Sequence, residues 1–433
     1  MKELKKYYIK TYGCAMNYAD TERIRYILNN SGLQEVSKYT DADIVILNSC
    51  SVRKQAEDKI AGWGIKKKKD SRKRKYLLTG CMAVRHNRKE QTLEGKYTKK
   101  LKRQFPWLDY IVDIRDVEKI PSIFGIKNTQ EEVPNYLNIP TDKVGEALVN
   151  IPISTGCNFF CSYCIVPFSR GQLLHRRYED ILLEVEENIK RGSKLICLVA
   201  QNVNSWQGYK DGKKISFAEL LDDIASIKGD FWITFVSSNP MDFTDEIIDV
   251  IAKNEKIMRW INIAVQSGSD DVLKRMNRKY TVNDFEILVK KIREKVPDIR
   301  LTTDIIVGFP GETVEDFEKT LELTKKVKFQ MLYVGKYSPR ERALSSSFED
   351  NVSRKEKKRR EDILKEELNK MRDVYHNSLV GKKMKILVIG GRRGISYYYH
   401  EILFEKPLKK ENVGQFVEGL ITDSTLSGLV AKV

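Results

Sequence analysis

The chain has 433 residues, and 77 Lys and Arg against 60 Asp and Glu give it a net charge of +17. Its length predicts two or three domains, and its hydrophobic fraction of 41% suffices to fill their cores. No run of about 18 apolar residues occurs, and the N-terminal segment has no apolar run of signal-peptide length. We therefore expect a cytoplasmic protein without a membrane segment, whose cysteines are thiols or metal ligands rather than disulfides. The positive charge favours a polyanionic partner, unless it only reflects a lysine-rich proteome.

Residues 1–125 predict an open parallel α/β sheet. Three strand-like runs, KYYIKTY, DIVILNS and KYLLT, are separated by helical patterns such as 21–32, in which Ile24, Ile27 and Leu28 share one face. A cysteine follows each run: Cys14, Cys50 and Cys81. The C-terminal ends of parallel strands lie at one edge of a sheet, so we expect the three cysteines to converge there.

Residues 143–375 predict a partial (β/α)6 barrel. Six apolar runs, from ALVNIPIS to MLYVGKYS, alternate with amphipathic helical segments. Polar residues lie just beyond several runs, at the barrel's C-terminal rim, where active sites of such barrels form: Gln201, Asn202, Ser237 and Gln266. Ordinary capping and turn roles are the alternative for these residues.

The last segment, 376–433, predicts a small OB-like β-barrel. Its short strand patterns are separated by glycine turns, and barrels of this kind often bind RNA. Tyr397, Tyr398, Tyr399 and Phe404 are candidates to stack on unpaired bases, although at least one of the three tyrosines is expected to face the core of the small barrel.

Three of the seven cysteines, Cys157, Cys161 and Cys164, lie within eight residues and follow the first barrel strand. A [4Fe–4S] cluster normally takes four thiolates, so three leave one iron open for a substrate or cofactor. A zinc site with a distant fourth ligand is the alternative. Cys197 lies among apolar residues in a predicted strand and is interpreted as a buried core thiol.

With these motifs the chain resembles the radical S-adenosylmethionine (SAM) methylthiotransferases. The likeness is carried by the cysteine trio, by the N-terminal motifs TYGCAMN and NSCSVR, and by the barrel motifs LVAQNVNSW, VQSGSDDVLKRMNRKYT and TDIIVGFPGET; the C-terminal segment resembles a TRAM domain. It extends over nearly the whole chain and is greatest to the subgroup that modifies isopentenylated adenosine in tRNA. Two departures are Ala15, where Gln is usual, and INIA, where His-Leu-Pro is usual before VQSGS.

The resemblance implies two [4Fe–4S] clusters and SAM as cofactors. Cys157, Cys161 and Cys164 would hold the cluster that cleaves SAM to a 5′-deoxyadenosyl radical. Cys14, Cys50 and Cys81 would hold an auxiliary cluster that supplies sulfur. Candidates to contact SAM are Gln201, Asn202, Ser237, Gln266 and Arg278, the last through the SAM carboxylate. No catalytic residue beyond the cluster cysteines is assigned.

The expected function is methylthiolation of C2 of N6-isopentenyladenosine at position 37 of tRNA. Alternatives are the same reaction on threonylcarbamoyladenosine in tRNA or on an aspartate of a ribosomal protein, and a non-catalytic, metal-stabilised RNA-binding role. Expected partners are the tRNA anticodon stem-loop, which the basic segments 66–75 and 354–360 would contact, and a flavodoxin-like or ferredoxin-like electron donor. We expect a monomer that does not bind membranes.

Overall fold

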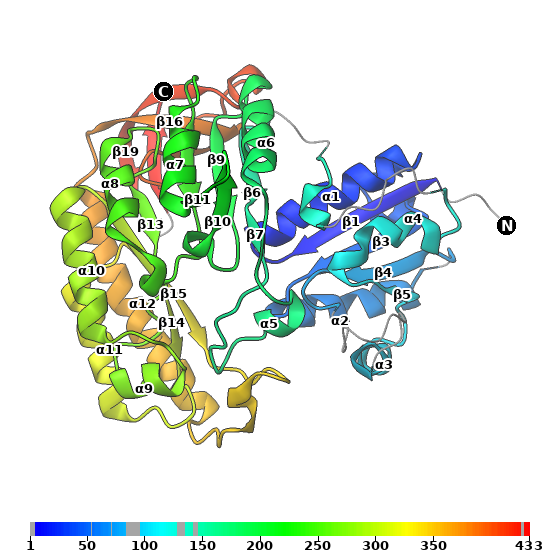
Figure 1. Cartoon of the computed structure of the whole chain (residues 1–433), viewed down its shortest axis with the longest axis horizontal. Coiled ribbons are helices and arrows are strands. Elements are labelled where there is room, and N and C mark those ends of the chain that lie inside the picture. The colour runs from blue at the N-terminus through cyan, green and yellow to red at the C-terminus, as the bar shows by residue number, and fades with distance from the viewer. Residues whose placement is uncertain are drawn as a thin grey trace. The chain divides into compact units, whose positions relative to one another are not determined.

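The computed structural model of the chain consists of two compact units (Figure 1). The first contains Met1–Lys143, Ser154–Phe160 and Cys164–Arg176, and the second contains Val144–Ile153, Cys161–Tyr163 and Arg177–Val433. The structure describes residues 5–52, 54–70, 72–83, 96–127, 135–141, 146–425 and 428–433. The division of the sequence into domains 1–125, 143–375 and 376–433 stays a prediction. Among the described residues, no helix has the length and apolar character needed to span a membrane.

The first unit is built on a parallel sheet in the order β2-β1-β3-β4-β5. Its strands are β1 (Lys6–Tyr12), β2 (Gln34–Glu35), β3 (Ile44–Ser49), β4 (Lys75–Thr79) and β5 (Tyr110–Ile111). The predicted open parallel sheet is confirmed. The central strand β3 is buried along its whole length, as its apolar run predicts. The edge strands β2 and β5 were not predicted, because two residues are too few to show a period.

Helices connect the strands of this sheet: α1 (Ala15–Asn30), α2 (Lys54–Lys68), α3 (Lys96–Gln104) and the single turn α4 (Ile120–Ile123). α1 buries Ile24, Ile27 and Leu28, the predicted apolar face. The buried Asn48 at the end of β3 donates hydrogen bonds to the Asn17 carbonyl at 2.7 Å and the Thr21 hydroxyl at 2.9 Å. These bonds fix the start of α1, directly after Cys14, against the end of β3.

The second unit contains the predicted six-stranded partial barrel. Its parallel strands are β6 (Leu148–Pro152), β9 (Leu195–Val199), β12 (Trp232–Phe235), β13 (Trp260–Asn262), β14 (Arg300–Val307) and β15 (Met331–Lys336). They form the sheets β6-β9-β12 and β13-β14-β15, which parallel bridges join at Ile233–Ile257 and Ser238–Ile263. The fold prediction is confirmed here too.

Helices cover the outside of these strands (Figure 1): α6 (Tyr178–Lys190), α7 (Phe217–Ser226), α8 (Asp245–Lys253), α10 (Val282–Lys295), α11 (Val314–Val327) and α12 (Arg354–Asn377). The short helix α9 (Asp270–Arg275) follows β13. Two small hairpins were not predicted: β7 (Ser154–Thr155) with β8 (Leu174–His175) in the first unit, and β10 (Gln207–Lys210) with β11 (Lys213–Ser216) in the second.

The C-terminal segment forms the predicted small barrel, closed in the order β16-β17-β18-β20-β19. Its strands are β16 (Lys383–Gly390), β17 (Arg393–Ser396), β18 (Glu401–Phe404), β19 (Phe416–Ser424) and β20 (Leu429–Lys432). Alternate residues of these strands point inward, so Ile386, Val388 and Phe404 are fully or almost fully buried in its core.

This C-terminal barrel packs against the N-terminal ends of the larger barrel's strands. The Tyr399 ring stacks on Trp260, the first residue of β13, with ring centroids 4.4 Å apart. The Tyr397 hydroxyl donates to the Ile257 carbonyl at 2.7 Å, and the Arg300 guanidinium donates to the Tyr398 carbonyl at 3.1 Å. The prediction that these aromatic residues stack on RNA bases is therefore wrong for Tyr397 and Tyr399, whose rings pack within the protein. It is also wrong for Phe404, which is buried in the core of the small barrel. The rim at the opposite strand ends is not covered by this barrel.

Candidate functional site

The structure brings Cys14, Cys50 and Cys81 to one edge of the N-terminal sheet. Asn48 of β3 pairs with Thr79 of β4, and Cys50 and Cys81, each two residues farther along the chain, lie just beyond the ends of these adjacent strands. The Cys50 amide donates to the carbonyl of Tyr12, the last residue of β1, at 2.8 Å. Cys14, which caps α1, follows the same strand end. Three loops of one sheet edge thus position the three thiols.

The surroundings of these three thiols differ. Cys14 is exposed, whereas Cys50 and Cys81 are 4% and 5% exposed. The Cys50 sulfur accepts a hydrogen bond from the Val52 amide at 3.3 Å. Burial raises the pKa of the Cys81 thiol to about 12, which the nearby thiols of Cys50 and Cys14 support and the Arg170 charge opposes. A thiolate at Cys81 therefore requires further positive charge, such as iron.

Arg170 connects this edge to the segment that carries Cys157 and Cys164. Its Nε lies 3.0 Å from the Cys81 sulfur, and its two Nη atoms contact the Asp20 carboxylate at 2.5 and 3.3 Å. Tyr136 completes the group, because its hydroxyl accepts from Arg170 at 2.7 Å and donates to Asp20 at 3.1 Å. The ion pair is buried, with side chains 1% and 0% exposed. The sequence analysis missed all three residues, since nothing local predicts that Asp20 and Arg170 meet across 150 positions.

Cys157 and Cys164 belong to the first unit. Cys157 lies three residues before Phe160, and Cys164 lies two residues before the short helix α5 (Val166–Ser169). The Cys157 sulfur accepts from the Phe159 amide and the Cys164 sulfur from the Val166 amide, both at 3.4 Å. Gly156 makes the backbone path directly before Cys157 possible, because its φ is +78° and a Cβ there would lie 2.1 Å from the Gln172 carbonyl oxygen.

In the second unit, Cys161 contacts Arg278. The Arg278 Nη1 lies 3.5 Å from the Cys161 sulfur, while Nη2 donates to the Ala264 carbonyl at 2.8 Å and Nε to the Tyr280 hydroxyl at 3.0 Å. Arg278 is thus held beside the thiol and the end of β13. Its predicted contact with the SAM carboxylate stays a prediction.

Five of the six predicted cluster cysteines accept an N–H hydrogen bond at sulfur: Cys50, Cys81, Cys157, Cys161 and Cys164. Such donors favour the thiolate, and thiolate is the ligand of iron–sulfur clusters. This donor set therefore fits the two implied clusters. Among the described residues, no three His, Cys, Asp or Glu side chains are grouped to hold a single metal ion. In a [4Fe–4S] cluster each thiolate binds a different iron, so its ligands need not converge on one ion. The absence of a single-ion site among the described residues therefore does not bear on the clusters.

The predicted rim residues lie beyond the strand ends, and two of them have strained backbones. Ser237 and Gln266 both have a φ of +71°, which is rare outside glycine and is concentrated at functional sites. Gln201 lies two residues beyond the end of β9 and is half-buried. The buried Asn202 donates from Nδ2 to the Asp242 carboxylate at 2.5 Å. Asp242 was missed in the sequence; burial raises the pKa of its carboxyl group.

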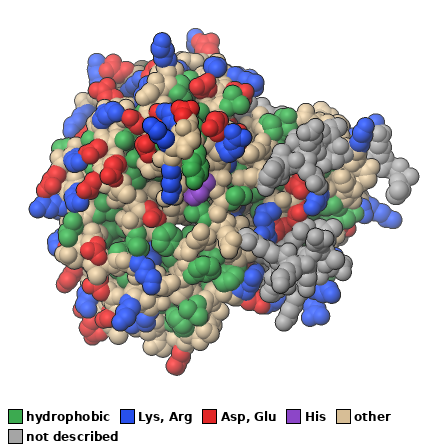
Figure 2. Space-filling model, viewed as in Figure 1, with side chains coloured by type: hydrophobic (Ala, Val, Ile, Leu, Met, Phe, Trp, Pro, Cys, Tyr) green, Lys and Arg blue, Asp and Glu red, His purple; other side chains and the backbone are tan. Residues whose placement is uncertain are grey.

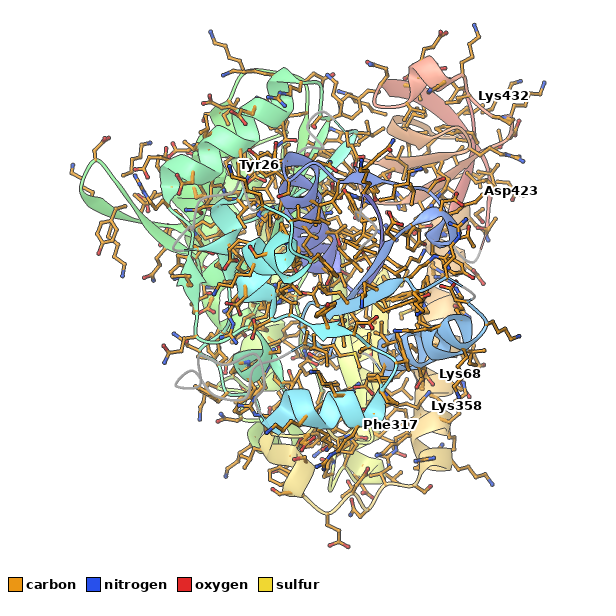
Figure 3. The ribbon with its side chains drawn as sticks, turned by 90° about the vertical axis from the view of Figure 1, so that its right-hand side faces the viewer. Tyr26, Lys68, Phe317, Lys358, Asp423 and Lys432 are labelled. Atoms are coloured by element: carbon orange, nitrogen blue, oxygen red, sulfur yellow. The ribbon has the colours of Figure 1, made fainter. Side chains whose placement is uncertain are left out.

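The basic segment 354–360 lies on α12 and is largely neutralised by nearby acids. Lys358, whose side chain is labelled in Figure 3, pairs with Asp362 at 2.5 Å. Arg359 pairs with Glu356 at 2.8 Å, and Lys357 and Arg360 are buried. These contacts argue against the predicted RNA footprint on α12. In segment 66–75, by contrast, Lys68, Lys69 and Lys73 are exposed at and beyond the end of α2.

Comparisons with known proteins place these observations in a family context. The family model "Radical SAM superfamily" matches residues 151–324, and the model "Uncharacterized protein family UPF0004" matches residues 6–101. A protein of Fusobacterium nucleatum named tRNA-2-methylthio-N(6)-dimethylallyladenosine synthase is 37% identical over 401 residues, covering 89% of each chain. Proteins with the same name from Treponema denticola, 36% identical over 88% of each chain, and Caldicellulosiruptor saccharolyticus, 37% identical over 89% of this chain and 82% of the relative, also match.

Among solved structures, that of a cobalamin-dependent S-adenosylmethionine radical enzyme, OxsB, matches with a TM-score of 0.51 and 13% identity. The match covers 74% of this chain and 52% of that one. At this identity the match supports the fold alone.

Proposed function

We infer the activity of the chain from the family to which it belongs, that of the tRNA-2-methylthio-N(6)-dimethylallyladenosine synthases of the radical SAM superfamily. It is a radical SAM methylthiotransferase that transfers a methylthio group to C2 of N6-isopentenyladenosine in tRNA. The observation that carries this conclusion is 37% identity over 89% of the chain, which spans both the cysteine-bearing sheet and the barrel. The names of these relatives do not favour the threonylcarbamoyl or ribosomal-protein alternatives.

We propose that each cysteine trio holds one of the two [4Fe–4S] clusters. Cys157, Cys161 and Cys164 would hold the cluster that binds SAM, and Cys14, Cys50 and Cys81 would hold the auxiliary cluster. When bound, SAM and the clusters supply a 5′-deoxyadenosyl radical, which removes a hydrogen from an unactivated C–H bond, and the sulfur that replaces it. The proposal that each trio holds a cluster is supported by the all-thiol donor set and by the N–H groups that contact five of the six sulfurs.

We propose that the other residues of the site bind and orient the cofactors. The strained turns at Ser237 and Gln266, together with Gln201 and Asn202, are proposed to hold the polar groups of SAM at the rim. Arg278 places a cation beside the Cys161 sulfur, where it would offset the negative charge of a bound cluster. The C-terminal barrel packs at the other end of the strands, so it does not occupy the rim at which we propose that SAM binds.

The finer partners are proposals as well. We propose position 37 of the anticodon stem-loop as the target, a flavodoxin-like or ferredoxin-like protein as electron donor, a monomeric enzyme and a cytoplasmic location. The exposed lysines of segment 66–75 support an RNA partner, because cations of this kind neutralise backbone phosphates.

The test is anaerobic reconstitution of the chain with iron and sulfide, followed by incubation with SAM, a reductant and isopentenylated tRNA. Mass spectrometry of the digested nucleosides should show one added methylthio group on the isopentenyladenosine. A matched tRNA that lacks the isopentenyl group serves as the control and should remain unmodified. Formation of 5′-deoxyadenosine without a methylthio product would contradict the proposed substrate while retaining the radical chemistry.

A further inference from the structure

The Arg170–Asp20 pair is built around a sulfur atom. A buried arginine usually satisfies its donors with carboxylates or carbonyl oxygens, but Arg170 directs Nε at the Cys81 sulfur, 3.0 Å away. Asp20 and the Tyr136 hydroxyl bind the Nη atoms, so the guanidinium cannot turn without breaking contacts on its other side. The arrangement holds one N–H against one particular thiol.

The same arginine is tied to the other cysteine trio. Arg170 directly follows α5, the single helical turn that starts two residues after Cys164. Cys164, Arg170, Asp20 and Cys81 all belong to the first unit. A stretch of six residues therefore joins a thiol proposed for one cluster to a cation that contacts a thiol proposed for the other.

We propose that Arg170 is a positioning residue that sets the reduction potential of the auxiliary cluster, and that Asp20 limits its effect. This proposal rests on the assignment of Cys14, Cys50 and Cys81 to that cluster under the proposed function. A hydrogen bond to a ligating sulfur withdraws electron density from it, and a nearby positive charge stabilises the reduced cluster, so both effects raise the potential. The carboxylate of Asp20 opposes the charge of Arg170 but leaves its N–H on the sulfur.

The two residues are therefore expected to act with opposite signs. Arg170→Met removes the charge and the N–H group and should lower the auxiliary-cluster potential. Asp20→Asn removes the opposing carboxylate and should raise it. The double variant D20N/R170M leaves no unpaired buried charge, so it is better suited to fold than R170M, and it should still show a lowered potential because the N–H···S contact is lost.

The experiment uses the full-length chain with Cys157, Cys161 and Cys164 replaced by alanine, so that only the auxiliary cluster is loaded. A reductive titration followed by electron paramagnetic resonance measures its potential in this background and in R170M, D20N and D20N/R170M. Arg23→Met is the control, because Arg23 is an equally buried arginine on the same helix as Asp20 whose Nε donates to the Leu137 carbonyl at 3.0 Å. It should leave the potential unchanged.

The two levels of inference fail in different ways. Potentials of D20N and D20N/R170M that equal that of Arg23→Met, or that move in the same direction, contradict the role of Arg170 while the cluster assignment stands. A parent chain that binds no iron in this background contradicts the assignment of Cys14, Cys50 and Cys81, and with it the proposal.

Discussion

An N–H group directed at a sulfur atom favours the thiolate, whereas burial among apolar side chains favours the neutral thiol. Burial raises the pKa of both Cys81 and Cys197 to about 12. Of these two thiols, Cys81 has the Arg170 guanidinium 3.0 Å away, whose charge opposes the rise, and Cys197 in β9 has no such cation among the causes of its shift. The prediction that Cys197 is a core thiol is confirmed by its 3% exposure in the middle of the strand.

This contrast predicts how iron binding responds to single replacements. Cys50→Ala should lower the iron content of the reconstituted chain from about eight to about four atoms, because one of two four-iron clusters loses a ligand. Cys197→Ala, the same replacement at an equally buried cysteine, should leave the iron content unchanged. Iron analysis after gel filtration measures both variants. Equal losses in the two would contradict the assignment of Cys50 as a ligand.

Glycine conformation gives a second prediction at this scale, in the turn GFPGET. Gly308 has a φ of +69°, and a Cβ there would lie 2.2 Å from Cγ of Lys357 on α12. Gly311 in the same turn has a φ of +78°, but its nearest contact would be an ordinary 3.5 Å. Backbone strain should lower the free energy of unfolding of both alanine variants by about 1 to 2 kcal/mol. The loss should be larger for Gly308→Ala than for Gly311→Ala, because Lys357 must also move. Thermal unfolding midpoints measure the difference, and equal midpoints would refute it.

At the scale of elements, the last turn of α12 joins the two barrels through a buried histidine. The His376 side chain is 2% exposed; its Nδ1 lies 3.4 Å from the Thr425 carbonyl oxygen, and its ring lies 5.8 Å from that of His400. Burial first, and then the charge of Arg300, lowers the pKa of His376 to about 4, and burial also lowers that of His400. Both rings are therefore neutral in the folded chain at neutral pH.

The sign of the pH dependence follows from this difference. Between pH 6.5 and 4 the unfolded chain binds protons at these rings and the folded chain does not, so stability falls as the pH is lowered. Each histidine contributes up to about 1.4 kcal/mol per pH unit within this window. His376→Gln should therefore reduce the slope of the unfolding free energy against pH, measured by thermal unfolding from pH 7 to 5. An unchanged slope would show that other groups dominate.

Elements with a clear period or an apolar run could be predicted from the sequence, and contacts between distant elements could not. The strands that precede Cys14, Cys50 and Cys81 have apolar runs, and their parallel order follows from the alternation with helices. The partner of Cys81 could not be predicted, because Arg170 is 89 residues away and no local pattern relates the two. The tyrosines of the C-terminal barrel were misread because their composition suits both base stacking and packing on Trp260.

For the whole molecule, a net charge of +17 does not by itself define a binding surface. On the face shown in Figure 2, basic and acidic side chains are intermixed over the barrel unit. A cation that is paired with a carboxylate on the same helix has much of its positive charge offset by that neighbour. We therefore expect only exposed cations away from acids to displace counterions from RNA. Lys358 and Arg359 on α12 are of the first kind.

This distinction predicts different effects from equal changes in charge. Replacing Lys68, Lys69 and Lys73 by glutamine should weaken tRNA binding and make the slope of log K against log salt concentration shallower by roughly 2 to 3, if each neutralises one phosphate. Replacing Lys358 and Arg359 should change it by less than one unit, since their charges are already paired with Asp362 and Glu356. Fluorescence anisotropy titrations with labelled tRNA between 50 and 200 mM salt give both slopes. Equal changes in slope per charge removed would contradict this prediction. They would mean that net charge, rather than the exposed lysines at the end of α2, governs the association with RNA.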